Sequence, residues 1–304
     1  MNANSLTITY LSKVSFASLN GSDKEVDNIN PIKKITLPDG NQVPYVSSQA
    51  MRRALRDKLS ELGYDLSPVQ ESSTSKGAPK TALNPIKYID DDLFGYMDAK
   101  AGQDGEAGTS NVRTSPVRVE SLVALATYKG DLDYATNFMG VKIKLNPNIF
   151  ETEIHSGVYR GTILIELDRV GVEWDYDKKE KVLVKKELIP AEEKARRVIA
   201  FLESFQTMWS SGRQSRFLAD ISPKFVAAAL MKSKNPVFLE AVDLGANGQI
   251  AIEKLHSVVS DYEKYIVEHV FAVQQAVFDK TDEMVSMKEG FAFMEDWVKK
   301  YYQV

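Results

Sequence analysis

The sequence of 304 residues contains no cysteine. This absence excludes a disulfide framework, a thiolate zinc site, a thiol nucleophile and dithiol redox chemistry. Histidine is scarce as well: His155, His256 and His269 are far apart, and none belongs to the two-histidine motif of helical zinc proteases. The motif Gly-x-Ser-x-Gly and the pair Gly-Lys do not occur. A nucleophile elbow of the α/β-hydrolase kind and a Walker phosphate loop are therefore excluded.

Long apolar runs are also lacking. The longest extends from Phe225 to Met231, far too short to span a bilayer, and the first residues do not resemble a signal peptide. The acidic run at residues 90–92 lacks the ligand spacing of a calcium loop. We therefore expect a cytoplasmic protein without a metal, a cofactor or a membrane contact. With 43% hydrophobic and 26% charged residues, the composition is that of a folded globular protein.

The charge is unevenly distributed, although the formal net charge is only −4. Residues 33–58 contain six basic and two acidic side chains, a balance of +4. Residues 235–304 contain six basic and twelve acidic side chains, a balance of −6. A cationic region on an acidic protein indicates a confined site for a polyanion.

The hydrophobic pattern predicts an α+β fold. Apolar residues alternate in a strand that starts at Leu6, and a helix follows with apolar residues at four positions of one face, from Met51 to Leu62. Strands at residues 116–127 and 157–168, a helix from Pro190 to Gly212 and a buried strand at 225–231 complete the series. This order of strand, helix, strand, strand, helix, strand is the ferredoxin-like arrangement of RNA-recognition domains.

The pattern divides the chain into three parts. Residues 1–64 and 113–234 form the predicted ferredoxin-like domain. Residues 65–112 are rich in Pro, Gly and Ser and form an insertion, which we expect to project without regular structure and to become ordered on binding. Residues 235–304 form a C-terminal, largely helical extension packed on that domain, with a strand near 237–242 and helices near 250–266 and 282–302.

Three groups of polar residues are candidates for RNA binding. The first lies in and before the first helix, where arginine forks on one face suit phosphate oxygens, although Asp57 and Glu61 could equally pair with a solvated helix face. The second is a glycine-containing loop, which also could simply cap a helix, and the third leads out of the insertion. The predicted RNA-binding residues are Lys33, Lys34, Ser48, Gln49, Arg52, Arg53, Arg56, Arg113, Gly212, Arg213, Gln214, Ser215 and Arg216.

Six segments carry a resemblance to a known family. They are Ser-Phe-Ala-Ser-Leu-Asn-Gly (15–21), Ile-Lys-Lys-Ile (32–35), Pro-Tyr-Val-Ser-Ser-Gln-Ala-Met-Arg-Arg-Ala-Leu-Arg (44–56), Asp-Asp-Asp-Leu-Phe-Gly-Tyr-Met (90–97), Arg-Thr-Ser-Pro-Val-Arg-Val (113–119) and Gly-Arg-Gln-Ser-Arg-Phe-Leu-Ala-Asp (212–220). From about Leu6 to Met231 the chain resembles the backbone subunit of the type I-B CRISPR Cascade complex, the DevR-type family. The capped arginine helix is the most specific segment.

The resemblance implies a non-catalytic protein that binds CRISPR guide RNA. In that family a ferredoxin-like palm holds the guide phosphates, and a thumb crosses the guide held by the neighbouring copy. The guide bases stay open to pair with target DNA. The partners would be the guide RNA, target DNA through the guide, further copies of the chain and other Cascade subunits. Residues 65–112 would supply the thumb, in which Phe94 and Met97 could insert between bases or pack on the palm.

Three other functions remain open at this point. Asp23 and Asp27 occupy a loop comparable to that of RNA-cleaving backbone subunits of type III-like CRISPR effectors. A guide-processing nuclease needs a histidine or lysine at its base-binding face, and His155 is the sole histidine in the first half of the chain. The chain could also be an oligomeric structural protein without nucleic acid.

Overall fold

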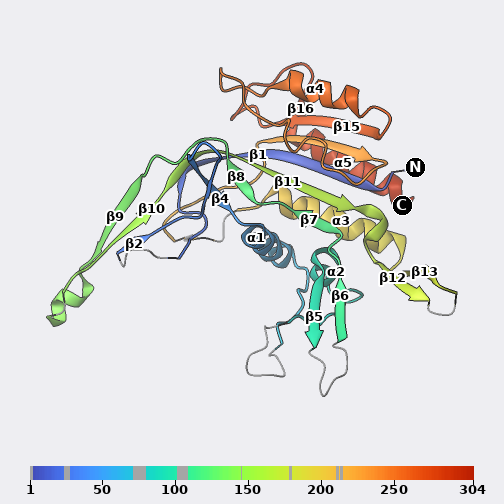
Figure 1. Ribbon diagram of the computed structural model, residues 1–304, viewed down its shortest axis with the longest axis horizontal. Coiled ribbons are helices and arrows are strands. Elements are labelled where there is room, and N and C mark those ends of the chain that lie inside the picture. The colour runs from blue at the N-terminus through green and yellow to red at the C-terminus, as the bar shows by residue number, and fades with distance from the viewer. Residues whose placement is uncertain are drawn as a thin grey trace.

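The computed structural model describes residues 3–23, 28–70, 80–100, 109–144, 146–177, 180–209, 212 and 215–304. A large mixed sheet forms its centre (Figure 1). The strand order is β16 (Val285–Ser286), β15 (Ile266–Val273), β14 (Phe225–Met231), β1 (Ser5–Ala17), β11 (His155–Glu166), β8 (Leu122–Ala124), β4 (Gln42–Val46) and β3 (Lys34–Thr36), with β7 (Val117–Val119) also paired to β11. β1 lies antiparallel to both β11 and β14.

Helices cover both faces of this sheet. On one face lie α1 (Ser48–Glu61), α3 (Ala191–Gln206) and α5 (Met287–Tyr302), and their apolar sides pack on Leu6, Ile8 and Tyr10 of β1. On the other face, α4 (Ile252–Asp261) and the preceding loop cover Leu11 and the alternate residues of β14. β14 is a continuous apolar run because both of its faces are buried, as the sequence pattern predicts.

The helix ends follow local chemistry. The Ser47 hydroxyl accepts a hydrogen bond from the Ala50 N–H, which fixes the start of α1, and Gly63 adopts a positive φ of 88° just beyond its end. Pro190 precedes α3, and Glu192 and Glu193 lie in its first turn, where carboxylates are favourable. The two predicted helices that face the sheet are therefore present.

The C-terminal extension differs from the prediction. Residues 237–241 form turns, because local hydrogen bonds close the chain on itself: the Ala241 and Val242 N–H groups both donate to the carbonyl of Phe238, each at 3.1 Å. The predicted helix near 250–266 ends at Asp261, and β15 begins at Ile266 after a tight turn at Tyr262. The extension is thus not largely helical: it adds β15 and β16 to the edge of the central sheet.

The insertion at 65–112 has regular structure in its described residues, contrary to the expectation. It contains α2 (Ile89–Phe94) and a hairpin of β5 (Tyr96–Lys100) and β6 (Thr109–Arg113), which projects from the body (Figure 1). The hairpin pairs Met97 with Val112. α2 is fixed because its acidic side chains are buried against polar partners, which composition alone does not reveal.

A second projection was not predicted. β9 (Leu132–Asn137), the 3-10 helix η1 (Met139–Ile143) and β10 (Asn148–Glu153) form a long arm, with β2 (Ile29–Asn30) pairing parallel to β10. The arm extends from one end of the molecule, and the hairpin of β12 (Val172–Asp177) and β13 (Val182–Glu187) lies at the other end (Figure 1). Within the described residues, none of the helices combines the length and apolarity that a membrane span requires.

Candidate nucleic-acid interface

The three arginines of α1 do not form one uniform track. Arg53 is mostly exposed, and its Nε donates to Asp57 Oδ1 at 2.8 Å across one helical turn. Arg52 and Arg56 instead face the insertion, where the Arg52 Nη2 donates to the carbonyl oxygen of Phe94. Of the three arginines of α1, Arg53 therefore faces solvent, whereas Arg52 and Arg56 face α2.

The pair formed by Arg52 and Arg56 carries more positive charge than its surroundings neutralise. The Arg56 Nε lies 3.4 Å from Asp90 Oδ2, and Arg52 has a carbonyl partner but no ion pair among the contacts of the described residues. Its buried Nε has no hydrogen-bond partner there. Burial, followed by the neighbouring Arg56, lowers the pKa of Arg52. The pair is therefore a candidate site for an anion such as a phosphate.

Ser48 and Gln49 lie in the first turn of α1. The Ser48 hydroxyl donates to the carbonyl of Val119 at 2.7 Å, while its N–H donates to the Ser121 hydroxyl at 3.1 Å. Ser48 thus joins α1 to the strands beside it. Gln49 is exposed, so its amide is accessible to a ligand.

Arg113 has a structural position. Its guanidinium contacts Asp92 Oδ1, and its Nη1 donates to the carbonyl of Val172 at 2.8 Å. The side chain is nearly fully buried in this network. Such a position leaves little surface for RNA, and we omit Arg113 from the residues proposed below to bind it.

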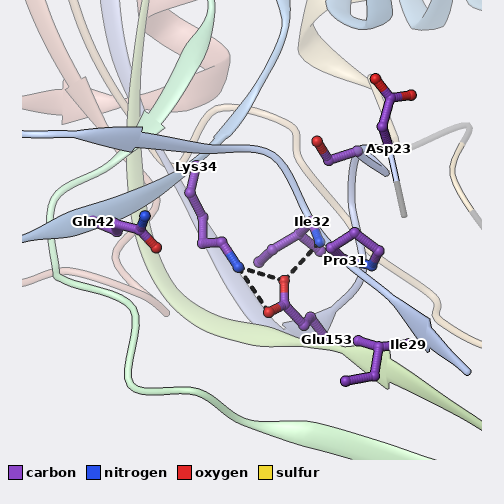
Figure 2. Close-up of a pocket in the computed structure, with 8 residues that line it drawn as sticks. Asp23, Ile29, Pro31, Ile32, Lys34, Gln42 and Glu153 are labelled. Atoms are coloured by element: carbon purple, nitrogen blue, oxygen red, sulfur yellow. Dashed lines mark hydrogen bonds and ion pairs between the residues drawn. The ribbon is translucent and has the colours of Figure 1, made fainter. Parts of the chain in front are cut away.

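Lys34 is tied to the base of the arm (Figure 2). Its Nζ lies 2.7 and 2.6 Å from the two carboxylate oxygens of Glu153, and it lies over the ring of Tyr128 at 4.5 Å. The Ile32 N–H donates to the same carboxylate at 2.9 Å. These contacts neutralise Lys34, whereas neighbouring Lys33 is partly exposed.

The predicted 212–216 loop also meets the arm. Arg216 forms an ion pair with Asp133, donates to the Thr152 hydroxyl at 3.2 Å and lies over the rings of Phe150 and Phe217. Arg216 therefore fixes the arm base from the opposite side to Lys34. Ser215 is exposed and Gly212 is partly exposed. The predictions for Arg213 and Gln214 fall outside the described residues.

The two predicted thumb residues have different environments. Phe94 is buried, and its ring packs edge-on against Phe201 of α3 at 6.2 Å between centroids. Phe94 therefore packs on the body of the protein, and its buried ring is poorly placed to insert between bases. Met97 is exposed on the projecting hairpin and remains available for contact.

Sequence reasoning missed the arm tip. Phe138, Met139 and Ile143 have exposed fractions of 64%, 82% and 71%, and Lys142 and Lys144 lie beside them. Exposed apolar side chains gathered on one projection are characteristic of a contact surface. The signal in the sequence was the motif Phe-Met-Gly-Val-Lys-Ile-Lys, which places apolar and basic side chains together between two strand-like segments.

The residues of the alternative nuclease functions differ in their surroundings. Asp23 lines a cavity of about 320 Å³ with Lys34 and Glu153 (Figure 2), whereas Asp27 falls outside the described residues. His155 is buried, its Nδ1 lies 2.7 Å from the Tyr159 hydroxyl, and burial lowers its pKa. Among the described residues we find no cluster of carboxylates or histidines suited to a metal ion.

Comparison of the fold places the chain in a structural class. It is similar to a chain of a solved structure described as CRISPR RNA-guided surveillance complex, pre-nicking, with a TM-score of 0.60, 15% identity and coverage of 97% of this chain and 99% of that chain. A chain of a second CRISPR RNA-guided surveillance complex gives a TM-score of 0.59, 16% identity and coverage of 98% and 99%. At these identities the similarity shows a shared fold.

Sequence comparison then gives the family. The family model described as CRISPR-associated negative auto-regulator DevR/Csa2 matches residues 8–247. The chain belongs to this DevR-type family, as the six segments predicted. It is also 26% identical over 229 residues to the CRISPR-associated protein Cas7/Cst2/DevR of Myxococcus xanthus (strain DK1622), covering 71% of this chain and 68% of the relative.

Proposed function

We propose that the chain is a non-catalytic subunit that binds CRISPR guide RNA and multimerises along it to form the backbone of a type I-B Cascade complex. The observation that carries the proposal is the incompletely neutralised pair of Arg52 and Arg56 on the capped helix, in a chain of the DevR-type family. The guide is then presented for pairing with target DNA. Other copies of the chain and other Cascade subunits are its protein partners.

The topology supports a ferredoxin-like palm within this proposal. The antiparallel order β14, β1, β11, β8, with α1 and α3 on one face, matches the strand and helix order of that arrangement. We assign the thumb role to the β9–β10 arm in addition to the β5–β6 hairpin, because the arm tip has exposed apolar side chains. Lys34 and Arg216 then act by holding the arm, and Arg52, Arg53 and Arg56 act on phosphates.

Binding should depend strongly on salt and little on sequence. Each neutralised phosphate releases a counterion, so affinity for single-stranded RNA should fall by about 10²-fold or more between 50 and 200 mM salt if several phosphates are contacted. Filter binding with two unrelated RNAs measures both effects, and RNA co-purifying with the protein gives a high ratio of absorbance at 260 to 280 nm. Affinity that is unchanged over this range would contradict the proposal.

An RNA-cleaving function is the second candidate, because Asp23 lines the cavity beside Lys34 and Glu153. We expect no cleavage of labelled RNA by the purified chain in magnesium or manganese, since a hydrolytic metal site needs several converging ligands. Gel analysis of RNA products measures the outcome. Cleavage that disappears in Asp23→Ala would favour the type III-like function over the non-catalytic one.

A further inference from the structure

The insertion supplies a support for the two arginines that face it. Phe94 occupies the last position of α2, and its ring lies under the guanidinium carbons of Arg52 and Arg56 at 5.5 and 4.6 Å. Its carbonyl oxygen also accepts a hydrogen bond from Arg52. One residue from the insertion therefore contacts both cations of α1 through its ring and one of them through its backbone.

The support itself is rigid. Phe94 is buried, and its ring packs on Phe201 of α3. Asp90, one turn earlier in α2, accepts the Ser67 N–H at 2.9 Å and lies beside Arg56. Burial raises the pKa of Asp90, although the Ser67 N–H and Arg56 act in the opposite direction. α2 is thus held in place independently of any ligand.

The geometry leaves the arginine edges usable. A ring that contacts a guanidinium through its face does not consume the N–H donors, which lie in the guanidinium plane. Two neighbouring guanidinium groups with one nearby carboxylate leave a net charge of about +1 to attract an anion. Without the ring, two long side chains would sample many rotamers and lose entropy on binding.

We propose that Phe94 is a positioning residue for guide binding, which holds Arg52 and Arg56 side by side so that their N–H edges meet phosphate oxygens. This inference rests on the proposed function. It also gives the insertion a second role, because the same residue that packs α2 on α3 orders the phosphate-binding side chains of α1.

A double-mutant cycle on the full chain tests the inference, with a single-stranded RNA that has no self-structure as the probe. Phe94→Leu should weaken RNA binding about three- to tenfold, the range expected for loss of a partly desolvated cation–π contact. The salt slope should stay unchanged, since no cation is removed. In an Arg52→Ala/Arg56→Ala background, Phe94→Leu should add less than about twofold, because the two residues it acts through are gone.

The controls separate positioning from folding. Phe238→Leu makes the same change at a buried site in the core on the other face of the sheet and should leave RNA affinity unchanged. Phe94→Met retains apolar volume without the ring. It replaces Phe94→Leu in the binding measurements if Phe94→Leu folds poorly. Wild-type affinity in both Phe94 variants, or an equal loss in the two backgrounds, overturns the inference. Wild-type affinity in Arg52→Ala/Arg56→Ala instead overturns the proposed phosphate site itself.

Discussion

Replacing Phe138 and Met139 with aspartate should abolish the formation of multimers on long RNA while one copy still binds short RNA. These side chains are 64% and 82% exposed at the arm tip, and no other part of the chain that the structure describes covers them. Burying two such side chains against a neighbouring copy contributes about 2–4 kcal/mol, so charged replacements should weaken assembly by about 30- to 1000-fold. Analytical ultracentrifugation on a long and a short RNA measures the difference.

Mixing experiments make this prediction sharper. If each arm docks on the next copy, the contact is head-to-tail, and such contacts generate open filaments. The tip variant can then receive a wild-type arm but cannot extend the filament, so substoichiometric amounts should shorten wild-type multimers. Phe293→Asp alters an aromatic residue on α5 that is 45% exposed, and it should leave multimers intact. Loss of short-RNA binding in the tip variant would show that the tip contacts the guide instead of a neighbour.

The parts of the fold that could be predicted are those in which a local pattern and burial agree. α1 carries Met51, Leu55 and Leu59 on one buried face, and its cap is formed by the adjacent Ser47. β14 is apolar throughout because it lies inside the sheet. In such segments the residues that determine the element lie within it, so the chain sequence is sufficient.

The parts that could not be predicted depend on distant partners or on exposure. α2 begins with three acidic residues that appear unsuited to a core, and its burial is possible because arginines and backbone N–H groups from other segments pair with them. The arm has a solvent-exposed apolar tip, whereas apolar residues in a sequence predict burial in a core. β15 was missed because only the turn at residues 262–265 separates it from α4, so the predicted helix was continued to residue 266.

In the candidate site, too, local sequence predicted some properties of single residues, and others depend on distant partners. The sequence identified Arg52, Arg56 and Arg216 as cations in suitable segments, but their roles differ because their partners come from elsewhere in the chain. Arg52 and Arg56 meet Phe94, whereas Arg216 meets Asp133 on the arm. Local spacing in the sequence does not encode these contacts, because the partners lie about 40 to 80 positions apart in the chain. Residue type therefore predicted that these side chains are cations, whereas their partners are visible only in the folded structure.

Asp92 holds the insertion to the body of the protein. Its carboxylate, with an exposed fraction of 0%, pairs with Arg113 and, at 2.8 Å, with Arg197 of α3. It also accepts the Gly171 N–H at 3.0 Å. The two arginine side chains are 8% and 3% exposed, and Arg197 further donates to the carbonyls of Pro85 and Ile86 at 2.6 and 2.7 Å. Asp92 therefore joins two buried cations from separate segments, and Arg197 has a further ion pair with Glu193 at 2.8 Å.

Asp92→Ala should consequently destabilise the whole domain. The substitution leaves two guanidinium groups buried without their shared partner, and breaking a buried ion pair in this way costs about 3–5 kcal/mol. For a chain of this size the melting temperature should fall by about 5–8 °C, as measured by differential scanning calorimetry. Asp57→Ala removes the partner of Arg53 in an exposed pair and should change stability by less than about 1 kcal/mol. Equal melting temperatures for the two variants would show that the Asp92 network contributes no more than a surface ion pair.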